Sequence, residues 1–162
     1  MLTARYGWCI LLAVSAAGFE LGTDGPGVIV VGIDGSPTSM RAGAYAAGLA
    51  RRQGSRIVAV YVTTTSVAAG FSSSIGVAMA QAMDEIAHEL GQQVKEAGAY
   101  HQISAEYRTA HGDPARELAQ IADDVKADAV VVGASTRAGH MVVGSVAVRL
   151  VRTGRWPVTV VP

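Results

Sequence analysis

Short apolar runs that alternate with helical segments are the feature that most restricts the fold of this chain. Residues 28–34, 56–63 and 128–133 form such runs, and they are rich in β-branched side chains with little polar alternation. This composition is typical of strands that are buried on both faces. Because a segment with helical patterning lies between successive runs, the sequence predicts a parallel sheet covered by helices on both faces.

Serine, aspartate, proline and glycine mark where the helices begin and end. Ser36 is a preferred N-cap and Pro37 a preferred first helical residue, while Gly54 is a typical C-terminal cap. Asp113 and Pro114 predict the start of a later helix in the same way. The other expected elements are helices over residues 77–97, 115–126 and 144–152, the first ended by Gly98, and strands over residues 103–109 and 157–161.

The order of the strands follows from their burial and from the handedness of their connections. The two most apolar strands, at residues 28–34 and 128–133, are expected side by side at the centre. With right-handed crossovers this gives a Rossmann-like α/β fold over residues 27–162. Its sheet is five-stranded, parallel and doubly wound, with the strand order 3-2-1-4-5. Ligands of such sheets bind where the winding direction reverses, here between the first and fourth strands.

Residues 1–26 differ in composition from the rest, and we expect a poorly ordered N-terminal extension. Arg5 precedes an apolar run over residues 6–17, which is too short to span a bilayer. The alternative is that residues 1–17 act as an export signal, because a basic start, an apolar stretch and small residues follow one another. The domain behind this segment is expected to be cytoplasmic, with no membrane partner.

The charge balance and the scarcity of cysteine disfavour several classes of function. Basic and acidic residues number 13 each, so nothing indicates the clustered positive charge that nucleic acids attract. The single cysteine, Cys9, and the scattered histidines offer no spacing for metal ligands. Neither a P-loop nor a nucleophile elbow is present. We find no catalytic constellation, and enzymatic activity stays an open alternative.

Two loops meet at the expected switch point. Asp34, at the end of the first strand, can accept hydrogen bonds from a ribose hydroxyl or an amine, or it can cap the next helix. The second loop, residues 133–145, leads into a helix near Gly144 and Ser145, whose N–H groups and dipole suit phosphates. The alternative is a glycine-rich turn that binds nothing.

Three stretches make the chain resemble the universal stress protein family. VIVVGIDGS at residues 28–36 is similar to the family's first strand and turn. HGDPARELAQIADDVKADAVVVGAS at residues 111–135 is similar to its third turn, helix and fourth strand. GSVAVRLVRTGRWPVTVVP at residues 144–162 resembles its closing segment. The resemblance covers residues 27–162.

The phosphate loop keeps only part of the family's pattern. Nucleotide-binding members carry Gly-x2-Gly-x9-Gly-Ser/Thr, and this chain keeps Gly133, Gly144 and Ser145. Thr136 stands where the second glycine belongs, and the following spacer is two residues shorter. Other branches of the family have a shortened loop and do not hold ATP. Arg137 lies in this loop, and we expect its charge to replace lost backbone contacts.

The resemblance implies a role for each matching residue. Asp34 would contact the ribose or adenine side of the ligand, and Val62 the adenine. Gly133, Gly144 and Ser145 would contact the phosphates. The implied ligand is ATP or another adenine nucleotide, with Mg²⁺, and the incomplete loop also allows no ligand at all.

The expected function is that of a stress-response sensor or adaptor, which binds an adenine nucleotide weakly and acts on an unidentified protein partner. The alternatives are a ligand-free dimeric interaction module and a slow ATPase. Residues 157–162 carry no charge and form an edge strand, which invites pairing with a second copy. The family resemblance also implies a homodimer through this strand. The alternative is that residues 1–26 cover this edge.

Overall fold

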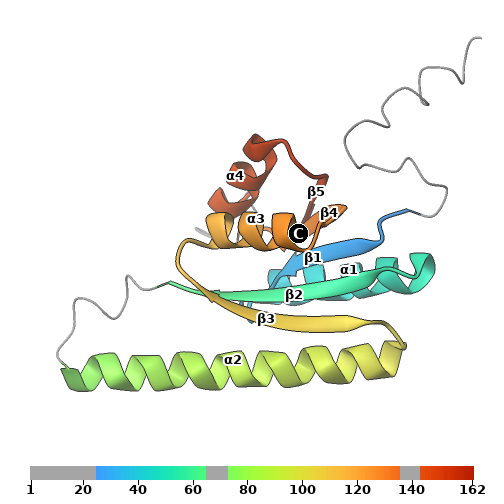
Figure 1. Cartoon of the computed structure of the whole chain (residues 1–162). Helices are drawn as coiled ribbons and strands as arrows, with labels where there is room; N and C mark the ends of the chain where they lie inside the picture. Colours follow the sequence, from blue (N-terminus) through green and yellow to red (C-terminus); the bar gives the residue numbers. More distant parts are fainter. Residues whose placement is uncertain (1–24, 65–72, 136–142) are drawn as a thin grey trace, which may run out of the picture.

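Strands and helices alternate along the part of the chain that the computed structural model describes, which is residues 25–64, 73–135 and 143–162. The elements are β1 (Val28–Gly32), α1 (Pro37–Gln53), β2 (Arg56–Thr63), α2 (Ser73–His101), β3 (Ala105–His111), α3 (Pro114–Asp124), β4 (Ala129–Gly133), α4 (Ser145–Thr153) and β5 (Val158–Val161). All strand pairs are parallel, and the order is β3-β2-β1-β4-β5 (Figure 1). The predicted fold class and strand order are confirmed.

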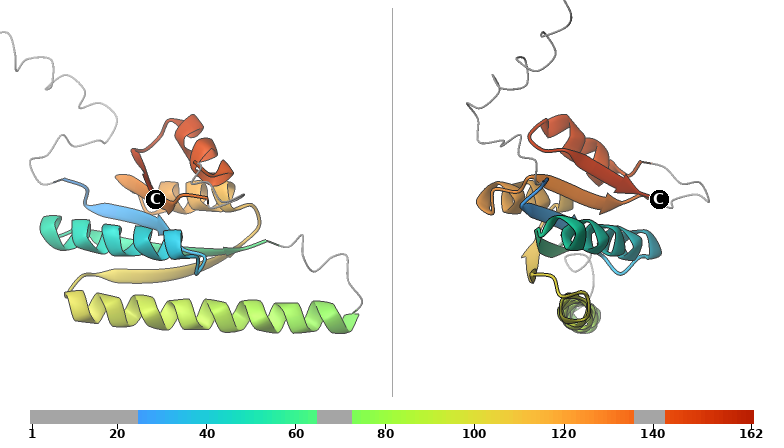
Figure 2. Two further views of the ribbon diagram at one scale, coloured as in Figure 1. Left: turned by 180° about the vertical axis from the view of Figure 1, so that it is seen from behind. Right: turned by 90° about the vertical axis from the view of Figure 1, so that its right-hand side faces the viewer.

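The sheet buries apolar side chains on both faces, which explains why its central strands are aliphatic throughout. Successive side chains of a strand point to opposite faces. Ile29 and Val31 pack in a cluster with α1 and α2, whereas Val30 and Val130 pack in a second cluster with α3 and α4. Figure 2 shows the sheet between these two layers. No helix within the described residues combines the length and apolar content needed to cross a membrane.

The capped helix starts predicted at Ser36 and Asp113 are confirmed in atomic detail, whereas α2 begins at Ser73 and not at residue 77. The Ser36 hydroxyl accepts a hydrogen bond from the Ser39 N–H at 3.3 Å, and Pro37 follows as the first helical residue of α1. Asp113 caps α3, because its Oδ1 accepts from the Arg116 N–H at 2.9 Å. Each cap satisfies a backbone donor that the helix itself leaves without a partner.

The predicted end of α2 is wrong. Gly98 does not stop the helix, which continues to His101. A Cβ at Gly98 would lie 3.0 Å from the Cβ of Ala105, so glycine serves here to bring α2 close to β3. The chain turns at Gln102, whose φ of 55° is left-handed, and the next N–H, of Ile103, donates to the Gly98 carbonyl at 3.0 Å.

The remaining differences concern element boundaries. β3 begins and ends two residues later than predicted, because the turn after α2 occupies the first residues of the expected strand. As expected of an edge strand, no residue of β3 is fully buried. The helix α3 ends at Asp124 rather than Lys126, whose φ of 53° is left-handed. Most of the expected extension, residues 1–24, lies outside the described residues, as do residues 65–72 and 136–142.

Asp113 joins two helices and offers a test of this arrangement. Its Oδ2 accepts from Arg149 of α4 at 2.6 Å, while its Oδ1 caps α3. We expect Asp113→Ala to lower the free energy of unfolding by about 1 kcal/mol through the lost cap. Asp113→Asn keeps the cap and loses only the exposed ion pair, so its loss should be a few tenths of a kcal/mol. Urea denaturation at neutral pH measures both.

The same variants have a pH dependence whose sign is fixed by the structure. The hydrogen bond from Arg149, and then that from the Arg116 backbone, hold the pKa of Asp113 below its usual value. The stabilisation is therefore complete above the usual aspartate pKa, and it is lost as the pH falls through the lowered pKa. The difference between parent and Asp113→Ala should shrink over that acidic range. A difference that stays constant with pH would contradict this assignment.

Candidate functional site

A pocket of about 620 Å³ lies where β1 and β4 end. These neighbouring strands lead to helices in opposite winding directions, so the pocket occupies the switch point of the sheet. Its lining comes from the ends of β1, β2 and β4 and from the first turns of α1, α3 and α4. The predicted site residues that line it are Asp34, Val62, Gly133, Gly144 and Ser145. Thr136 and Arg137 lie outside the described residues.

The first turn of α4 lines this pocket, and no side chain of the described residues caps it. Its N-cap is Gly144, which has no side chain to accept a hydrogen bond, and its first turn holds no acidic residue. Ser145, the first residue of α4, is exposed. A helix start without a cap keeps the full positive end of its dipole and its unpaired N–H groups. This combination suits an anionic group such as a phosphate.

Asp34 holds a fixed negative charge at the mouth of the pocket. Its Oδ1 accepts from the Ser36 N–H at 2.9 Å, and its own N–H donates to the Ser39 hydroxyl at 3.1 Å. Partial burial would raise the pKa of Asp34, but hydrogen bonds from Ser36 and Ser39 outweigh it and place the pKa below its usual value. The carboxylate is therefore an acceptor at neutral pH, suited to a hydroxyl or an amine.

Apart from Ser145, the hydroxyl groups in the pocket were not identified from the sequence. Thr38 and Ser39, from the first turn of α1, are almost fully buried, and Ser135 and Thr64 also line the pocket. The run Ser-Pro-Thr-Ser directly after the first strand was an available signal. The Ser39 hydroxyl is engaged within the fold, because it donates to the Ser36 carbonyl at 3.0 Å. Together with Ser145, Ser135 and Thr64 are the lining hydroxyls whose side chains have no described hydrogen bond within the fold.

Gly133 has a structural reason to be glycine that the sequence did not reveal. A Cβ at this position would lie 2.6 Å from both the Ser39 nitrogen and the Thr38 carbonyl carbon. Those are backbone atoms of α1, which cannot give way as a flexible side chain can. The absent side chain therefore allows α1 to start directly over the end of β4. Gly133 sets the shape of the pocket wall as well as lining it.

The described lining offers little to a metal ion. Asp34 is the single carboxylate among the described residues that line the pocket. No group of three potential metal-binding side chains occurs within the described ranges. A magnesium ion would therefore depend on the phosphate oxygens of a bound nucleotide, which is the usual way this ion is held in nucleotide sites.

Comparison with known proteins decides the family. The model of the Universal stress protein family matches residues 27–162, which is the whole domain. The chain belongs to the universal stress protein family. A universal stress protein of Methanocaldococcus jannaschii is 29% identical over 139 residues, covering 82% of this chain and 80% of the relative.

Solved structures agree with this assignment. A family protein from Burkholderia pseudomallei has a TM-score of 0.68 at 28% identity, covering 84% of this chain and 96% of its own. A universal stress protein solved in complex with cAMP has a TM-score of 0.59 at 29% identity, with the same coverages of 84% and 96%. Nucleotide binding thus occurs among the relatives of this universal stress protein.

The close approach at Gly133 predicts a strong effect of a single methyl group. Gly133→Ala should lower the free energy of unfolding by about 3 kcal/mol or more, because backbone of α1 must move away. Gly48→Ala is the matched control, since a Cβ there lies 3.4 Å from the flexible Arg52 side chain. In mid-helix this control should raise stability by about 0.5–1 kcal/mol. Thermal and urea unfolding compare the two, and equal effects would contradict the packing argument.

Proposed function

We propose that this universal stress protein is a stress-response sensor or adaptor that binds an adenine nucleotide weakly in the switch-point pocket. The observation that carries the proposal is the uncapped start of α4 at Gly144, which faces the same pocket as the Asp34 carboxylate. The start of α4 offers N–H donors and the positive end of a helix dipole, which suit a phosphate. The Asp34 carboxylate offers an acceptor for a ribose, so the two would bind opposite ends of one ligand.

The rest of the pocket suits the base. Val60 and Val62, near the end of β2, provide apolar surface, and the Thr64 hydroxyl lies beside them in the lining. A volume of about 620 Å³ is within the range of small-molecule sites. The relative that was solved with cAMP supports an adenine nucleotide as the ligand class.

Weak binding follows from the phosphate loop. Thr136 replaces a glycine of the family pattern, and the loop is two residues shorter, so fewer backbone N–H groups can approach a phosphate. Arg137 would offset part of this loss by its charge. We expect a dissociation constant in the micromolar range or weaker, which corresponds to about −8 kcal/mol or less favourable.

A binding role fits the site better than catalysis. The pKa of Asp34 is low, because the hydrogen bonds of Ser36 and Ser39 outweigh the effect of its burial, and a carboxylate of low pKa is a weak general base. Since no other described lining residue is a carboxylate, rapid hydrolysis of ATP is not expected.

Ser145 provides the test of the nucleotide site. Ser145→Asp places a negative charge at the start of α4, where it stabilises the helix but repels a phosphate. We expect isothermal titration to show at least tenfold weaker binding of ATP, AMP or cAMP, with the affinity for adenosine unchanged. Ser104→Asp is the control, because Ser104 is exposed and precedes β3 at the opposite edge of the sheet.

Two results would contradict the proposal. If none of the three nucleotides binds the parent protein up to millimolar concentration, the ligand-free interaction module is the better description. If the two aspartate variants lose affinity equally, the phosphate does not lie at α4.

We further propose a homodimer through β5, which the sheet leaves at one edge. Its side chains Val158 and Val160 pack toward α3 and α4, so a lysine at either position would also disturb the core. The carbonyls of Pro157 and Val161 accept from the N–H groups of Val130 in β4 and of Ala134 directly after it, at 2.9 and 2.7 Å. In a parallel strand, the backbone N–H and C=O groups of alternate residues form hydrogen bonds toward opposite sides. The backbone groups of Val158 and Val160 therefore face the open edge.

Proline at position 160 tests this dimer more cleanly than a charge. Val160→Pro removes an N–H from the open edge and keeps the bonds to β4, and proline is tolerated in edge strands. Sedimentation should show a dimer for the parent and a monomer for Val160→Pro, with similar circular dichroism. The parent without residues 1–24 serves as control, and a monomer in that case would overturn the β5 interface.

A further inference from the structure

The layer formed by α1 and α2 presents an outer surface that no other element of the described residues covers. Both helices pack on the same face of the sheet, because Ala42 and Ala46 of α1 and Leu90 of α2 belong to one core cluster. Figure 2 shows α1 and α2 on this side of the sheet, while α3 and α4 lie on the other. We call the outward surface of α1 and α2 the two-helix face.

Exposed large apolar side chains gather on these two helices. Seven such side chains occur among the described residues, and five of them belong to α1 or α2. They are Met40, Tyr45, Val77, Ile86 and Tyr100, with exposed fractions from 38% to 84%. Single exposed apolar residues are normal, but their concentration on one layer indicates a surface that another molecule covers.

The two helices carry opposite charges. The charged residues of α1 are Arg41, Arg51 and Arg52, and all three are exposed. The charged residues of α2, also exposed, are Asp84, Glu85, Glu89, Lys95 and Glu96. With three arginines on α1, and four carboxylates and one lysine on α2, the net charges are +3 and −3. None of these side chains forms an ion pair with another of the described residues, so each helix keeps its charge.

The charges on the two helices have matching spacing. Arg41 and Arg52 are 11 positions apart on α1, and Glu85 and Glu96 are 11 positions apart on α2. Eleven residues make about three helical turns and rise about 16 Å, so both members of each pair point to the same side. Glu89, one turn after Glu85, lies in the same row. A row of arginines on one helix therefore has the same length as a row of glutamates on the other.

The two rows also lie at similar heights along the sheet. Both helices run in the same direction, and each ends four residues before one member of a residue pair that joins β2 to β3. The last residues of α1 and α2 are therefore level, and so are positions whose numbers differ by 48. Arg41 is thus level with Glu89, and Arg52 lies about one turn beyond the level of Glu96. A long arginine side chain can span that difference.

A second copy of the chain has the charges that complement this face. A two-fold axis parallel to both helices, midway between them, brings α1 of one copy against α2 of the other at the same height, and does so twice. The arginine row of each copy then faces the glutamate row of the other. An axis across the helices would instead bring α1 against α1, where like charges repel.

We propose that the two-helix face binds a second copy of this chain, with α1 of each copy packed on α2 of the other. This surface is separate from β5, which lies at the edge of the sheet, and from the nucleotide pocket. The contact therefore requires neither the β5 interface nor a bound nucleotide.

The size of the face determines how strong the contact is. The 17 residues of α1 extend about 25 Å, and two helices are about 20 Å wide, so each copy contributes about 500 Å². Stable complexes bury about 800 Å² on each partner. The association is therefore weak and reversible, and it forms near millimolar protein concentration. At low micromolar concentration the oligomeric state depends on β5 alone.

Charge reversal on each helix tests this contact. All variants are made in the full chain with Val160→Pro, which removes the β5 contact, and sedimentation follows association up to millimolar concentration at low salt. Reversal of α1 (Arg41→Glu, Arg52→Glu) or of α2 (Glu89→Arg, Glu96→Arg) should weaken self-association at least tenfold, because like charges then meet. An equimolar mixture of the two reversed chains should associate at least as strongly as the Val160→Pro chain, because opposite charges meet again. Added salt should weaken every association.

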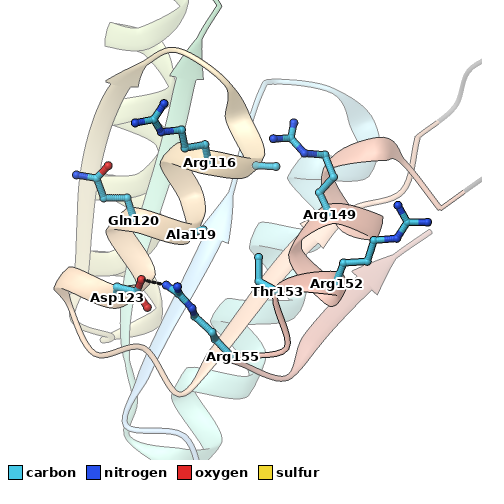
Figure 3. A pocket seen from close by; sticks show the side chains of 9 residues that line it. Arg116, Ala119, Gln120, Asp123, Arg149, Arg152, Thr153 and Arg155 are labelled. Carbon is cyan, nitrogen blue, oxygen red and sulfur yellow. Dashed lines mark hydrogen bonds and ion pairs between the residues drawn. The ribbon is translucent and has the colours of Figure 1, made fainter.

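The control separates complementarity at the face from attraction between net charges. Arg116→Glu, Arg152→Glu makes the same change of charge on α3 and α4, on the other side of the sheet. Figure 3 shows these two arginines pointing to opposite sides of a hollow between α3 and α4. The control should self-associate as the Val160→Pro chain does. Mixed with the chain reversed on α2, it should not reproduce the strong association of the two reversed chains.

Three results would overturn the two-helix contact. The first is a Val160→Pro chain that stays monomeric up to millimolar concentration, which leaves the β5 interface untouched and means that no second copy binds this face. The second is an equal loss of self-association in the control and in the reversed chains. The third is a mixture of the two reversed chains that associates no better than either chain alone, with circular dichroism showing that both are folded.

Discussion

The close packing of β4 against the start of α1 is the constraint on which the rest of the structure depends. At Gly133 the absence of a side chain lets the α1 backbone pass directly over the end of β4. At the opposite end, Asp128 Oδ2 accepts from the N–H groups of Gly27 and Val28 at 2.8 and 2.9 Å, which joins the starts of β1 and β4. With both ends fixed, the carboxyl ends of β1 and β4 lie side by side, and the pocket forms beyond them.

Local signals account for the part of the fold that the sequence predicted. Ser36 and Asp113 act within three residues of their own position, so their caps are visible in the sequence. The aliphatic runs of β1 and β4 have one explanation, which is burial on both faces. The end of α2 was predicted wrongly because Gly98 is required by its close contact with Ala105 of β3, and not by the end of the helix. A contact with another element cannot be recognised from the pattern along the helix.

The two concave surfaces differ in how far the sequence could predict them. The pocket residues follow strand ends and helix starts, so topology brought Asp34 and Gly144 to one place, whereas Val62 was implied by the family resemblance. The hollow between α3 and α4 (Figure 3) has no such signal, because Arg116 and Arg149 are 33 positions apart and belong to helices whose packing is a tertiary property.

The shortness of α4 has a consequence for how members of this lineage can diverge. Its nine residues serve three surroundings, since Ser145 lines the pocket, Leu150 is buried in the core, and Arg149 pairs with Asp113 at the start of α3. Because the helix is short, a replacement at one of these positions also affects its neighbours, so that ligand binding, core packing and the contact with α3 change together. Val151, which is 56% exposed, is the position where drift is least restricted. New ligand preferences should therefore arise by changes in the loop before α4, while the helix itself evolves slowly.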